Sequence, residues 1–334
     1  MASSPAGRGG ALVLAPFDAQ ALEDLRRLLP VTYESWLETR TLHDPEELGR
    51  RLGREGFTVL VVEADFVFEE LFQAAPGLRL VAVCRGSTGH VDLEAATRHG
   101  VAVVHTPGRN ARAVAEHVLA LMLTLARGIH RAHHYVVQGR WRDPVEPYAS
   151  MRGLELGERT LGIVGLGAIG RTLARLALAL DMRVLGYDPH VDRAPQGVEM
   201  VPLEELLRRS DFVSLHVPHT PETEGLLDAG RLALMRPTAY LVNATGAAVV
   251  DQEALAQALA SGRLAGAAVD VFEAHPVPPE NPLLGLDNVV LTPHIGGATV
   301  ETVRRHSRMV VEDVGRFLEG RRPLRLANPE VWPA

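Results

Sequence analysis

The stretch 160–180 reads TLGIVGLGAIGRTLARLALAL, and the order of its residue types decides the fold class. The apolar run 160–164 is typical of a buried parallel strand, and the run from residue 171 onward is typical of a helix. Between the two stands the hexapeptide 165–170, whose glycines have the spacing G-x-G-x-x-G. A strand, a glycine turn and a helix in this order predict a dinucleotide-binding βα unit.

Each glycine of this turn has a predicted role. Gly165 permits the tight turn, Gly167 lets the backbone approach a pyrophosphate, and Gly170 allows the helix to pack closely on the strand. The diphosphate would lie at the helix N-terminus beside Ala168 and Ile169, where unpaired N–H groups and the positive end of the helix dipole point at it. A glycine turn without a ligand is the disfavoured alternative, because strand, turn and helix coincide.

Asp188 supplies the acidic group that such a unit needs. It ends the next predicted strand, about twenty residues after the turn, where a carboxylate accepts hydrogen bonds from the ribose hydroxyls. The same carboxylate would repel a 2′-phosphate, and the next arginine along the chain is Arg193. We therefore expect NAD rather than NADP as the cofactor.

Outward from this unit, apolar strands alternate with helical stretches along almost the whole chain. Such alternation predicts parallel sheets with helices on both faces. Two series, one in the first hundred residues and one from residue 160, predict an α/β fold with two doubly wound parallel-sheet domains. The predicted strands are 11–17, 57–63, 78–84 and 101–106 in the first series, and 160–165, 182–188, 212–218, 239–245, 264–272 and 288–294 in the second.

Two predicted helices lie outside this simple alternation. Residues 111–138 are expected to form one long helix between the domains, and residues 299–320 an amphipathic helix that ends near Gly320. The apolar residues that keep to one face of the long helix are Val114, Val118, Leu121, Leu125 and Ile129.

The composition limits the chemistry. The chain has 334 residues and a net charge of −7, and all 34 of its basic residues are arginines. Without lysine, Schiff-base catalysis, a lysine general base and a P-loop lysine are excluded. The length allows about two domains. The net negative charge disfavours nucleic acid or an anionic membrane as a partner, and leaves a small molecule as the expected one.

Location and metal content follow from what the sequence lacks. Cys84 is the only cysteine, so we expect neither an internal disulfide nor a thiolate metal cluster. Residues 1–10 contain no apolar secretory segment, and no uncharged apolar run approaches the ~20 residues that span a bilayer. A cytoplasmic protein is therefore expected. His130, His133 and His134 have helical spacing that suits a metal, but without an acidic partner a solvated helix face is the favoured interpretation.

The stretches that carry a wider likeness are VDLEAATRHGVAVVHTPGRNARAVAEHVLALML (91–123), LGIVGLGAIG (161–170), HVPHTPETEGLL (216–227), LVNATGAAVVDQEAL (241–255), AGAAVDVFEAHP (265–276) and NVVLTPHIGGAT (288–299). With them the chain resembles the D-isomer-specific 2-hydroxyacid dehydrogenase family, in its phosphoglycerate dehydrogenase-like form, over nearly its whole length.

The resemblance implies a domain division, an assembly and a reaction. A flavodoxin-like substrate domain would comprise residues 1–110, completed by 300–334, and a Rossmann NAD-binding domain residues 111–299. The two would enclose a cleft, and a homodimer would form largely through the nucleotide domain. In such enzymes hydride passes between C4 of the nicotinamide and C2 of a 2-oxo or 2-hydroxy acid.

The family uses an arginine, a glutamate and a histidine, and this chain matches only the histidine. His294, in the tripeptide TPH, follows a predicted strand, and the resemblance implies that it is the acid/base for the substrate oxygen. The family's arginine lies five residues before an aspartate, and five residues before Asp251 stands Gly246. The family's glutamate lies five residues after the aspartate of D-V-F, and five residues after Asp270 stands His275.

Both departures change the expected chemistry. Without a side chain at Gly246, the site lacks the charged fork that holds the substrate, a contact worth about 1.5–3 kcal/mol. A charged imidazole at His275 would oppose protonation of His294, whereas a carboxylate would favour it. When neutral, His275 would donate or accept a hydrogen bond, or itself act as an acid or base. A solvated histidine in the proline-rich loop 275–282 is the alternative.

The remaining candidates lie in loops after predicted strands. The resemblance implies that the backbone N–H groups of Gly86, Ser87 and Thr88 hold the substrate carboxylate. Arg85 is a candidate cation for the substrate, with a solvent-facing position as its alternative, and Arg109 is a weaker candidate.

Three residues outside the glycine turn are expected at the cofactor. His216 and Pro218 begin the stretch 216–227, and Asp270 lies in the stretch 265–276. For His216, as for His105, a purely packed side chain is the alternative.

Three functions remain open from sequence. The first is an NAD-dependent oxidoreductase that acts on an unusual 2-oxo or 2-hydroxy acid, with loop amides or another arginine replacing the lost fork. The second retains NAD and His294 for a reaction without net redox change, such as an elimination or isomerisation. The third is a non-catalytic NAD-sensing protein. Fold alone does not decide among them.

Overall fold

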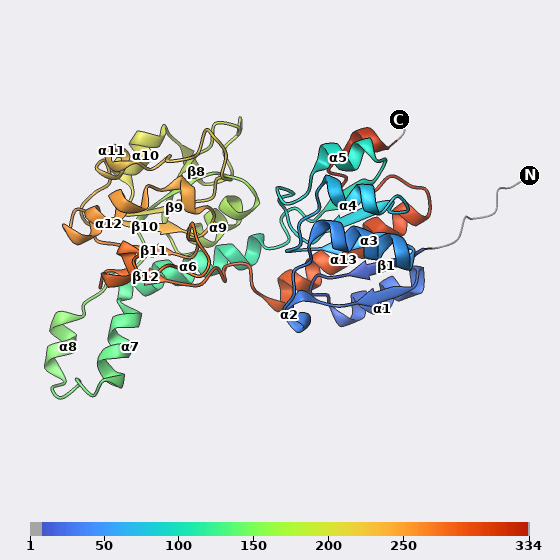
Figure 1. Cartoon of the computed structure of the whole chain (residues 1–334). Coiled ribbons are helices and arrows are strands. Elements are labelled where there is room, and N and C mark those ends of the chain that lie inside the picture. Colours follow the sequence, from blue (N-terminus) through green and yellow to red (C-terminus); the bar gives the residue numbers. More distant parts are fainter. Residues whose placement is uncertain (1–8, 333–334) are drawn as a thin grey trace, which may run out of the picture. The chain divides into compact units, whose positions relative to one another are not determined.

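The computed structural model describes residues 9–332 and divides into two compact units. The first comprises residues 1–109 and 299–334, and the second residues 110–298. Each unit has its own parallel sheet, and Figure 1 labels the elements of both. Residues 1–8 of the stretch in which we expect no secretory signal lie outside the described residues.

The first unit is a five-stranded sheet with the order β2-β1-β3-β4-β5, in which every pair is parallel. This is the flavodoxin-like order. Its strands are β1 (Gly10–Val13), β2 (Val31–Tyr33), β3 (Phe57–Val62), β4 (Leu80–Val83) and β5 (Ala102–His105). Its helices are α1 (Ala19–Leu28), α2 (Trp36–Thr39), α3 (Pro45–Glu55), α4 (Glu69–Ala74), α5 (Leu93–Arg98) and α13 (Val300–Leu318), with a short 3-10 helix η3 (Pro329–Val331).

Helices cover both faces of this sheet. Helices α1 and α13 pack on one face, where Val13 and Val310 are fully buried, and α3, α4 and α5 pack on the other. The C-terminal segment therefore belongs to the N-terminal sheet, although about 190 residues of the second unit separate them along the chain. Burial of the apolar face of α13 holds this discontinuous unit together.

The second unit is a seven-stranded parallel sheet with the order β12-β11-β10-β9-β6-β7-β8. Two series of strands extend in opposite directions, one from β6 and one from β9, so the topological switch point lies between these two strands. The strands are β6 (Thr160–Val164), β7 (Arg183–Tyr187), β8 (Val198–Met200), β9 (Phe212–Leu215), β10 (Tyr240–Asn243), β11 (Gly266–Val269) and β12 (Val289–Leu291).

The helices of the second unit lie on both faces of its sheet. Helices α6 and α9 share one hydrophobic core with the sheet, and α10, α11 and α12 share the other. These helices are α6 (Ala111–Arg127), α7 (Ile129–Val137), α8 (Val145–Ser150), α9 (Ala168–Leu178), α10 (Leu203–Arg209), α11 (Ala229–Leu232) and α12 (Gln252–Ala260), with 3-10 helices η1 (Ala247–Val249) and η2 (Pro282–Gly285). The prediction of two doubly wound α/β sheets is confirmed.

The prediction of one long helix over residues 111–138 is wrong. The observed helix is broken at Gly128, which has a left-handed φ of 59° and ends α6. Helix α7 then continues at an angle of 63° to α6. Ile129, which the prediction put on the same apolar face as Val114 and Leu125, is 52% exposed, whereas those two residues are buried. Glycine is the residue that adopts this conformation at least cost, so the break is encoded at Gly128 itself.

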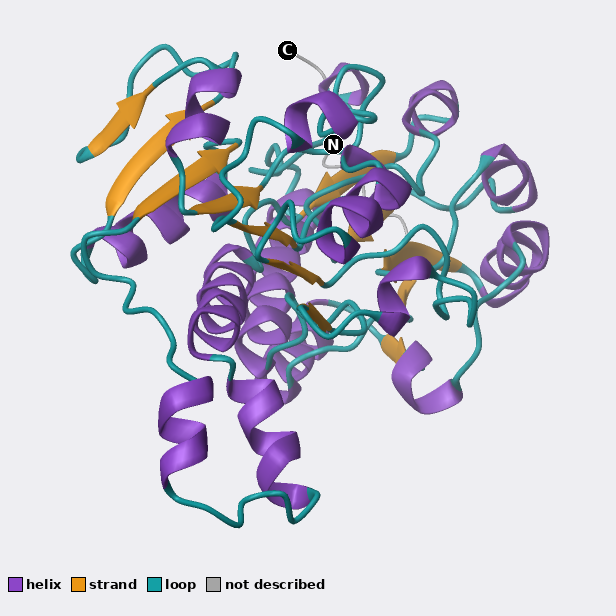
Figure 2. Cartoon of the chain, turned by 90° about the vertical axis from the view of Figure 1, so that its left-hand side faces the viewer, coloured by secondary structure: helices purple, strands orange, loops and turns teal. Residues whose placement is uncertain are grey.

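Helices α7 and α8 form an arm that projects from the rest of their unit, as both views show (Figures 1 and 2). Within the described residues, no single helix is long and apolar enough to span a membrane; only the bent pair α6–α7 satisfies that test of length and composition. Most of the apolar residues of α6 are buried in the core that it shares with α9.

Two strands were missed from sequence. β2 and β8 are three residues each and lie at sheet edges. Neither is fully buried, so neither has the continuous apolar run that marks a central parallel strand.

Candidate active site

The glycine turn lies at the carboxyl end of β6, at the switch point of the second sheet. Gly165 has a φ of 95°, and a Cβ there would lie 2.6 Å from the carbonyl oxygen of His216. A Cβ at Gly170 would lie 2.1 Å from the carbonyl oxygen of Gly165, so α9 packs against the turn only with glycine here. A Cβ at Gly167 would meet nothing within 4 Å. The first and third glycines therefore allow close packing, and the second leaves open space.

This open space suits a diphosphate. Gly167 is the N-cap of α9 and makes no side-chain capping hydrogen bond, so the amides of Ala168 and Ile169 begin a helix whose N-terminus is open to an anion. Asp188 follows β7, and its Oδ2 accepts a hydrogen bond of 2.7 Å from the amide of Leu166. The carboxylate is thus held at the turn itself, with lone pairs left for the ribose hydroxyls. The residues present fit a bound NAD.

His216 lies under this turn. It follows β9, and its Nε2 is 2.8 Å from Oγ of Ser214, whereas its Nδ1 is buried with no hydrogen-bond partner among the described residues. Burial lowers the pKa of His216 to about 3, so the ring is neutral. Its carbonyl oxygen lies close to Gly165, where a Cβ would clash with it, and the carbonyl oxygen of Pro218, two residues on, accepts a hydrogen bond from Thr223. Direct contacts of His216 and Pro218 with the cofactor stay predictions.

His294 is held by a loop that follows β12. Its φ of 56° is left-handed, a conformation that costs a non-glycine residue roughly 1 kcal/mol or more and persists only where the surroundings enforce it. Asp270, which follows β11 and is 1% exposed, provides that enforcement. Its carboxylate accepts hydrogen bonds from the Thr292 hydroxyl (2.6 Å) and from the amides of Ile295 (2.9 Å) and Gly296 (2.8 Å).

Asp270 is charged despite its burial. Burial alone would raise the pKa of its carboxyl, but hydrogen bonds from His117, Thr292, Ile295 and Gly296 outweigh burial and lower that pKa below its ordinary value. His117 Nε2 lies 3.4 Å from Oδ1. Sequence reasoning placed Asp270 at the cofactor and did not foresee this network, because its donors lie more than twenty residues away on both sides.

His275 and His294 come together. Their ring centroids are 5.3 Å apart and the ring planes meet at 32°. The two residues follow adjacent strands, β11 and β12, whose carboxyl ends lie at the same edge of the sheet.

Gly246 follows β10, the next strand along the same edge. Its φ of −150° is ordinary extended backbone, so a side chain is compatible with the conformation. A Cβ would meet Cγ2 of Val249 at 3.2 Å and Cβ of His219 at 3.9 Å. The carbonyl oxygen of Gly246 accepts a hydrogen bond of 2.8 Å from the Asn243 side chain. A side chain at this position therefore requires the Val249 side chain to shift by a few tenths of an ångström, and the glycine itself contributes no charge.

The predicted substrate loop lies in the other unit, after β4. The carbonyl oxygen of Arg85 accepts from the amide of Thr106 at 2.8 Å, and that of Gly86 lies 2.9 Å from Nδ1 of His105. These contacts give the loop a defined backbone between β4 and β5, with Ser87 exposed and Thr88 half-buried. The side chain of Arg85 is exposed and makes no ion pair with any described residue.

Arg109, the weaker candidate cation, is already engaged within the first unit. Its guanidinium lies 2.6 Å from a Glu63 carboxylate oxygen and 2.6 Å from Nδ1 of His306. Nε2 of His306 in turn lies 2.7 Å from the carbonyl oxygen of Pro16. His306 was missed from sequence; the only signal was its place on the face of α13 that also carries Val310 and Val314.

His306 makes the stability of the protein depend on pH. Burial, and to a smaller extent the charge of Arg109, lowers its pKa from 6.5 to about 4. Between these values the unfolded chain binds a proton that the folded chain does not, so stability falls as the pH decreases through this window. We expect the free energy of unfolding of His306→Gln to fall less between pH 6.5 and 4 than that of the wild type, measured by urea denaturation. The exposed His133→Gln is the control, and a slope unchanged in His306→Gln would contradict the assignment.

The family model for the D-isomer specific 2-hydroxyacid dehydrogenase NAD binding domain matches residues 119–296. A glyoxylate reductase of Korarchaeum cryptofilum is 45% identical over 80% of this chain and 81% of its own length. The chain belongs to the D-isomer-specific 2-hydroxyacid dehydrogenase family. It is an NAD-dependent oxidoreductase, as predicted.

Other members of this 2-hydroxyacid dehydrogenase family extend the match. A D-3-phosphoglycerate dehydrogenase of Archaeoglobus fulgidus is 37% identical over 92% of this chain, which spans 57% of that longer protein. The crystal structure of the TT0316 protein from Thermus thermophilus has a TM-score of 0.85 and 39% identity, covering 95% of this chain and 99% of that one. These comparisons lend no support to the non-redox and NAD-sensing alternatives.

Proposed function

We propose that this enzyme uses NADH to reduce a small 2-oxo acid of the glyoxylate type to the corresponding 2-hydroxy acid. The observation that carries the proposal is the placement of His294 by the buried Asp270, with His275 beside it at 5.3 Å between ring centroids. A histidine fixed at the carboxyl edge of a Rossmann sheet, next to a fitted dinucleotide site, is suited to exchange a proton with the substrate oxygen. The similarity to glyoxylate reductases supports the substrate type.

We assign cofactor binding to residues 110–298 and substrate binding to the unit of residues 1–109 and 299–334. When bound, NADH would supply the hydride for this reduction. His294 donates the proton to the reduced oxygen, and His275, when neutral, orients the His294 ring or relays its proton. The backbone amides of Gly86, Ser87 and Thr88, with Arg85, hold the substrate carboxylate.

The test restores the two altered positions. Gly246→Arg with His275→Glu is expected to lower KM for glyoxylate and raise kcat, by roughly ten-fold or more together, because a charge-assisted contact is worth about 1.5–3 kcal/mol. NADH absorbance is followed with glyoxylate, hydroxypyruvate and phosphohydroxypyruvate. Ala247→Arg, one residue along, is the matched control for an added guanidinium.

Wild-type turnover of at least one unphosphorylated 2-oxo acid is expected. If neither the wild type nor the double variant oxidises NADH with any of the three acids, the proposed reaction is wrong. If only the double variant does so, the natural site acts on a different substrate class.

We further propose that the enzyme is a cytoplasmic homodimer. The arm carries large exposed apolar side chains, among them Val137 (68%), Trp141 (60%) and Tyr148 (79%), a concentration that an interface would cover. A monomeric mass by light scattering at micromolar concentration would contradict the dimer.

A further inference from the structure

A hollow lies at the amino-terminal edge of the sheet in residues 110–298, opposite the edge that carries the glycine turn. It is a cavity of about 460 Å³ lined by residues that directly precede strands, including Arg159 before β6, Asp211 before β9 and Asn288 before β12. The glycine turn, His275 and His294 all follow strands. Parallel strands rise about 3.3 Å per residue, so the length of the strands separates the amino-terminal edge of the sheet from its carboxyl-terminal edge by roughly 15 Å.

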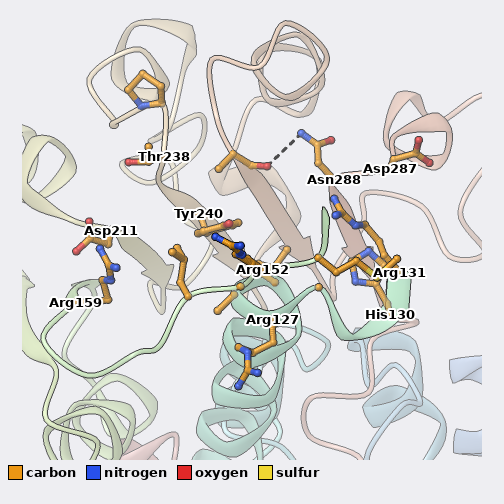
Figure 3. Close-up of a pocket in the computed structure, with 18 residues that line it drawn as sticks. Arg127, His130, Arg131, Arg152, Arg159, Asp211, Thr238, Tyr240, Asp287 and Asn288 are labelled. Carbon is orange, nitrogen blue, oxygen red and sulfur yellow. Dashed lines mark hydrogen bonds between the residues drawn. The ribbon is translucent and has the colours of Figure 1, made fainter. Parts of the chain in front are cut away.

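Positive charge dominates this hollow. Arg127, Arg131, Arg152 and Arg159 line it, and none of the four makes an ion pair with a carboxylate among the described residues. Figure 3 shows Arg131 beside His130, Arg152 beneath Tyr240 and Arg159 beside Asp211, whereas the guanidinium of Arg127 points away from these three arginines.

The two carboxylates that line the hollow do not balance this charge. Asp211 is already engaged, because it accepts hydrogen bonds from the amide of Thr160 and from Arg236 outside the hollow. Asp287 remains as the second acidic group against four guanidinium groups. Arginines without carboxylate partners in a concave site favour the binding of an anion. The planar guanidinium can donate two parallel hydrogen bonds to the oxygens of a phosphate.

The backbone around these arginines is closely packed. A Cβ at Gly153 would lie 2.5 Å from the carbonyl oxygen of Ala126 and 2.8 Å from Cα of Arg127, and the amide of Leu154 donates to that same carbonyl at 2.8 Å. The segment after α8 therefore lies directly on the end of α6. This contact places Arg152 and Arg127 on adjoining backbones rather than on independent loops.

His130 lies in the same hollow, against the backbone of Asp287. Its two ring nitrogens are buried, and burial lowers the pKa of the ring, whereas a hydrogen bond with the Asp287 backbone raises it. The ring therefore forms part of the polar lining beside Arg131.

We propose that this hollow binds a small phosphorylated metabolite. The arginines hold the phosphate, and the carbon body lies against Leu125, Leu154 and Tyr240, whose ring is stacked on Phe212 at 5.1 Å. The volume exceeds that of a phosphate ion and is in the range of ordinary small-ligand sites. The site lies where both stems of the arm meet the sheet, so the ligand ties residues 127–131 to residues 152–159. The inference does not depend on the proposed reaction.

Glycerol 3-phosphate, inorganic phosphate and glycerol are the probes, titrated by calorimetry into enzyme saturated with NAD so that the dinucleotide site is filled. Glycerol 3-phosphate is expected to bind more tightly than phosphate, and glycerol not at all. Arg131→Gln and Arg152→Gln should each weaken it by roughly ten-fold, since each removes a charge-assisted contact. Arg142→Gln, an exposed arginine of the arm outside the hollow, is the matched control.

Retention of NAD affinity and of the melting temperature in the variants shows that they are folded. Equal weakening by Arg142→Gln, equal binding of all three probes, or no binding of any probe would overturn the proposal. A loss of dimer mass in Arg131→Gln and Arg152→Gln without any probe binding to the wild type would also overturn it, because the arginines would then pair with a second copy.

Discussion

Replacing His294 with alanine is expected to lower the rate of NADH oxidation with a 2-oxo acid by about 10²–10⁴-fold, the usual contribution of a positioned acid or base. The ring is the only part of the side chain that can exchange a proton at neutral pH, and alanine leaves the Asp270 network to the loop amides intact. The loss should appear in kcat rather than in the affinity for NADH.

The measurement is steady-state NADH absorbance, with NADH affinity followed separately by fluorescence. His133→Ala, an exposed histidine on α7, is the control and should retain the wild-type rate. The neighbouring ring makes a further comparison possible, because His275 lies 5.3 Å away. A larger loss in His275→Ala than in His294→Ala would show that His275 is the acid/base and would reverse the proposed roles.

Replacing Asp270 with alanine should affect both stability and turnover. The Thr292 hydroxyl and the amides of Ile295 and Gly296 would lose their acceptor, and each buried unsatisfied donor costs about 1–3 kcal/mol. We expect the free energy of unfolding to fall by about 3 kcal/mol or more. Without this anchor the left-handed conformation at His294 is no longer enforced, so turnover should fall as well.

Urea denaturation and the NADH assay, run in parallel, check this prediction. Asp251→Ala is the control, since Asp251 also accepts from a backbone amide but as the N-cap of α12 on the surface, where the loss is typically about 1 kcal/mol. A stability loss in Asp270→Ala no larger than in the control, with only NAD affinity reduced, would contradict the anchoring role and favour direct contact with the cofactor.

Much of this architecture can be predicted from the sequence. Apolar strand runs bounded by helices predict parallel sheets, since only strands buried on both faces have continuous apolar runs. The edge strands β2 and β8 escaped detection because they are three residues long and only partly buried. The break between α6 and α7 was missed although Gly128 marks it, because apolar spacing carries no information about a left-handed φ.

The absence of a side chain at Gly246 and of a carboxylate at His275 is a property of the sequence alone, as is the absence of lysine to replace the lost cation. Which residues lie next to those two positions depends on the tertiary structure. Only the folded chain brings His275 beside His294, buries Asp270 under the loop and engages Arg109 with Glu63 and His306, because these partners are 19 to 197 residues apart in sequence. Local residue patterns record propensity and burial, whereas contacts between distant side chains are decided by the packing of adjacent parallel strands.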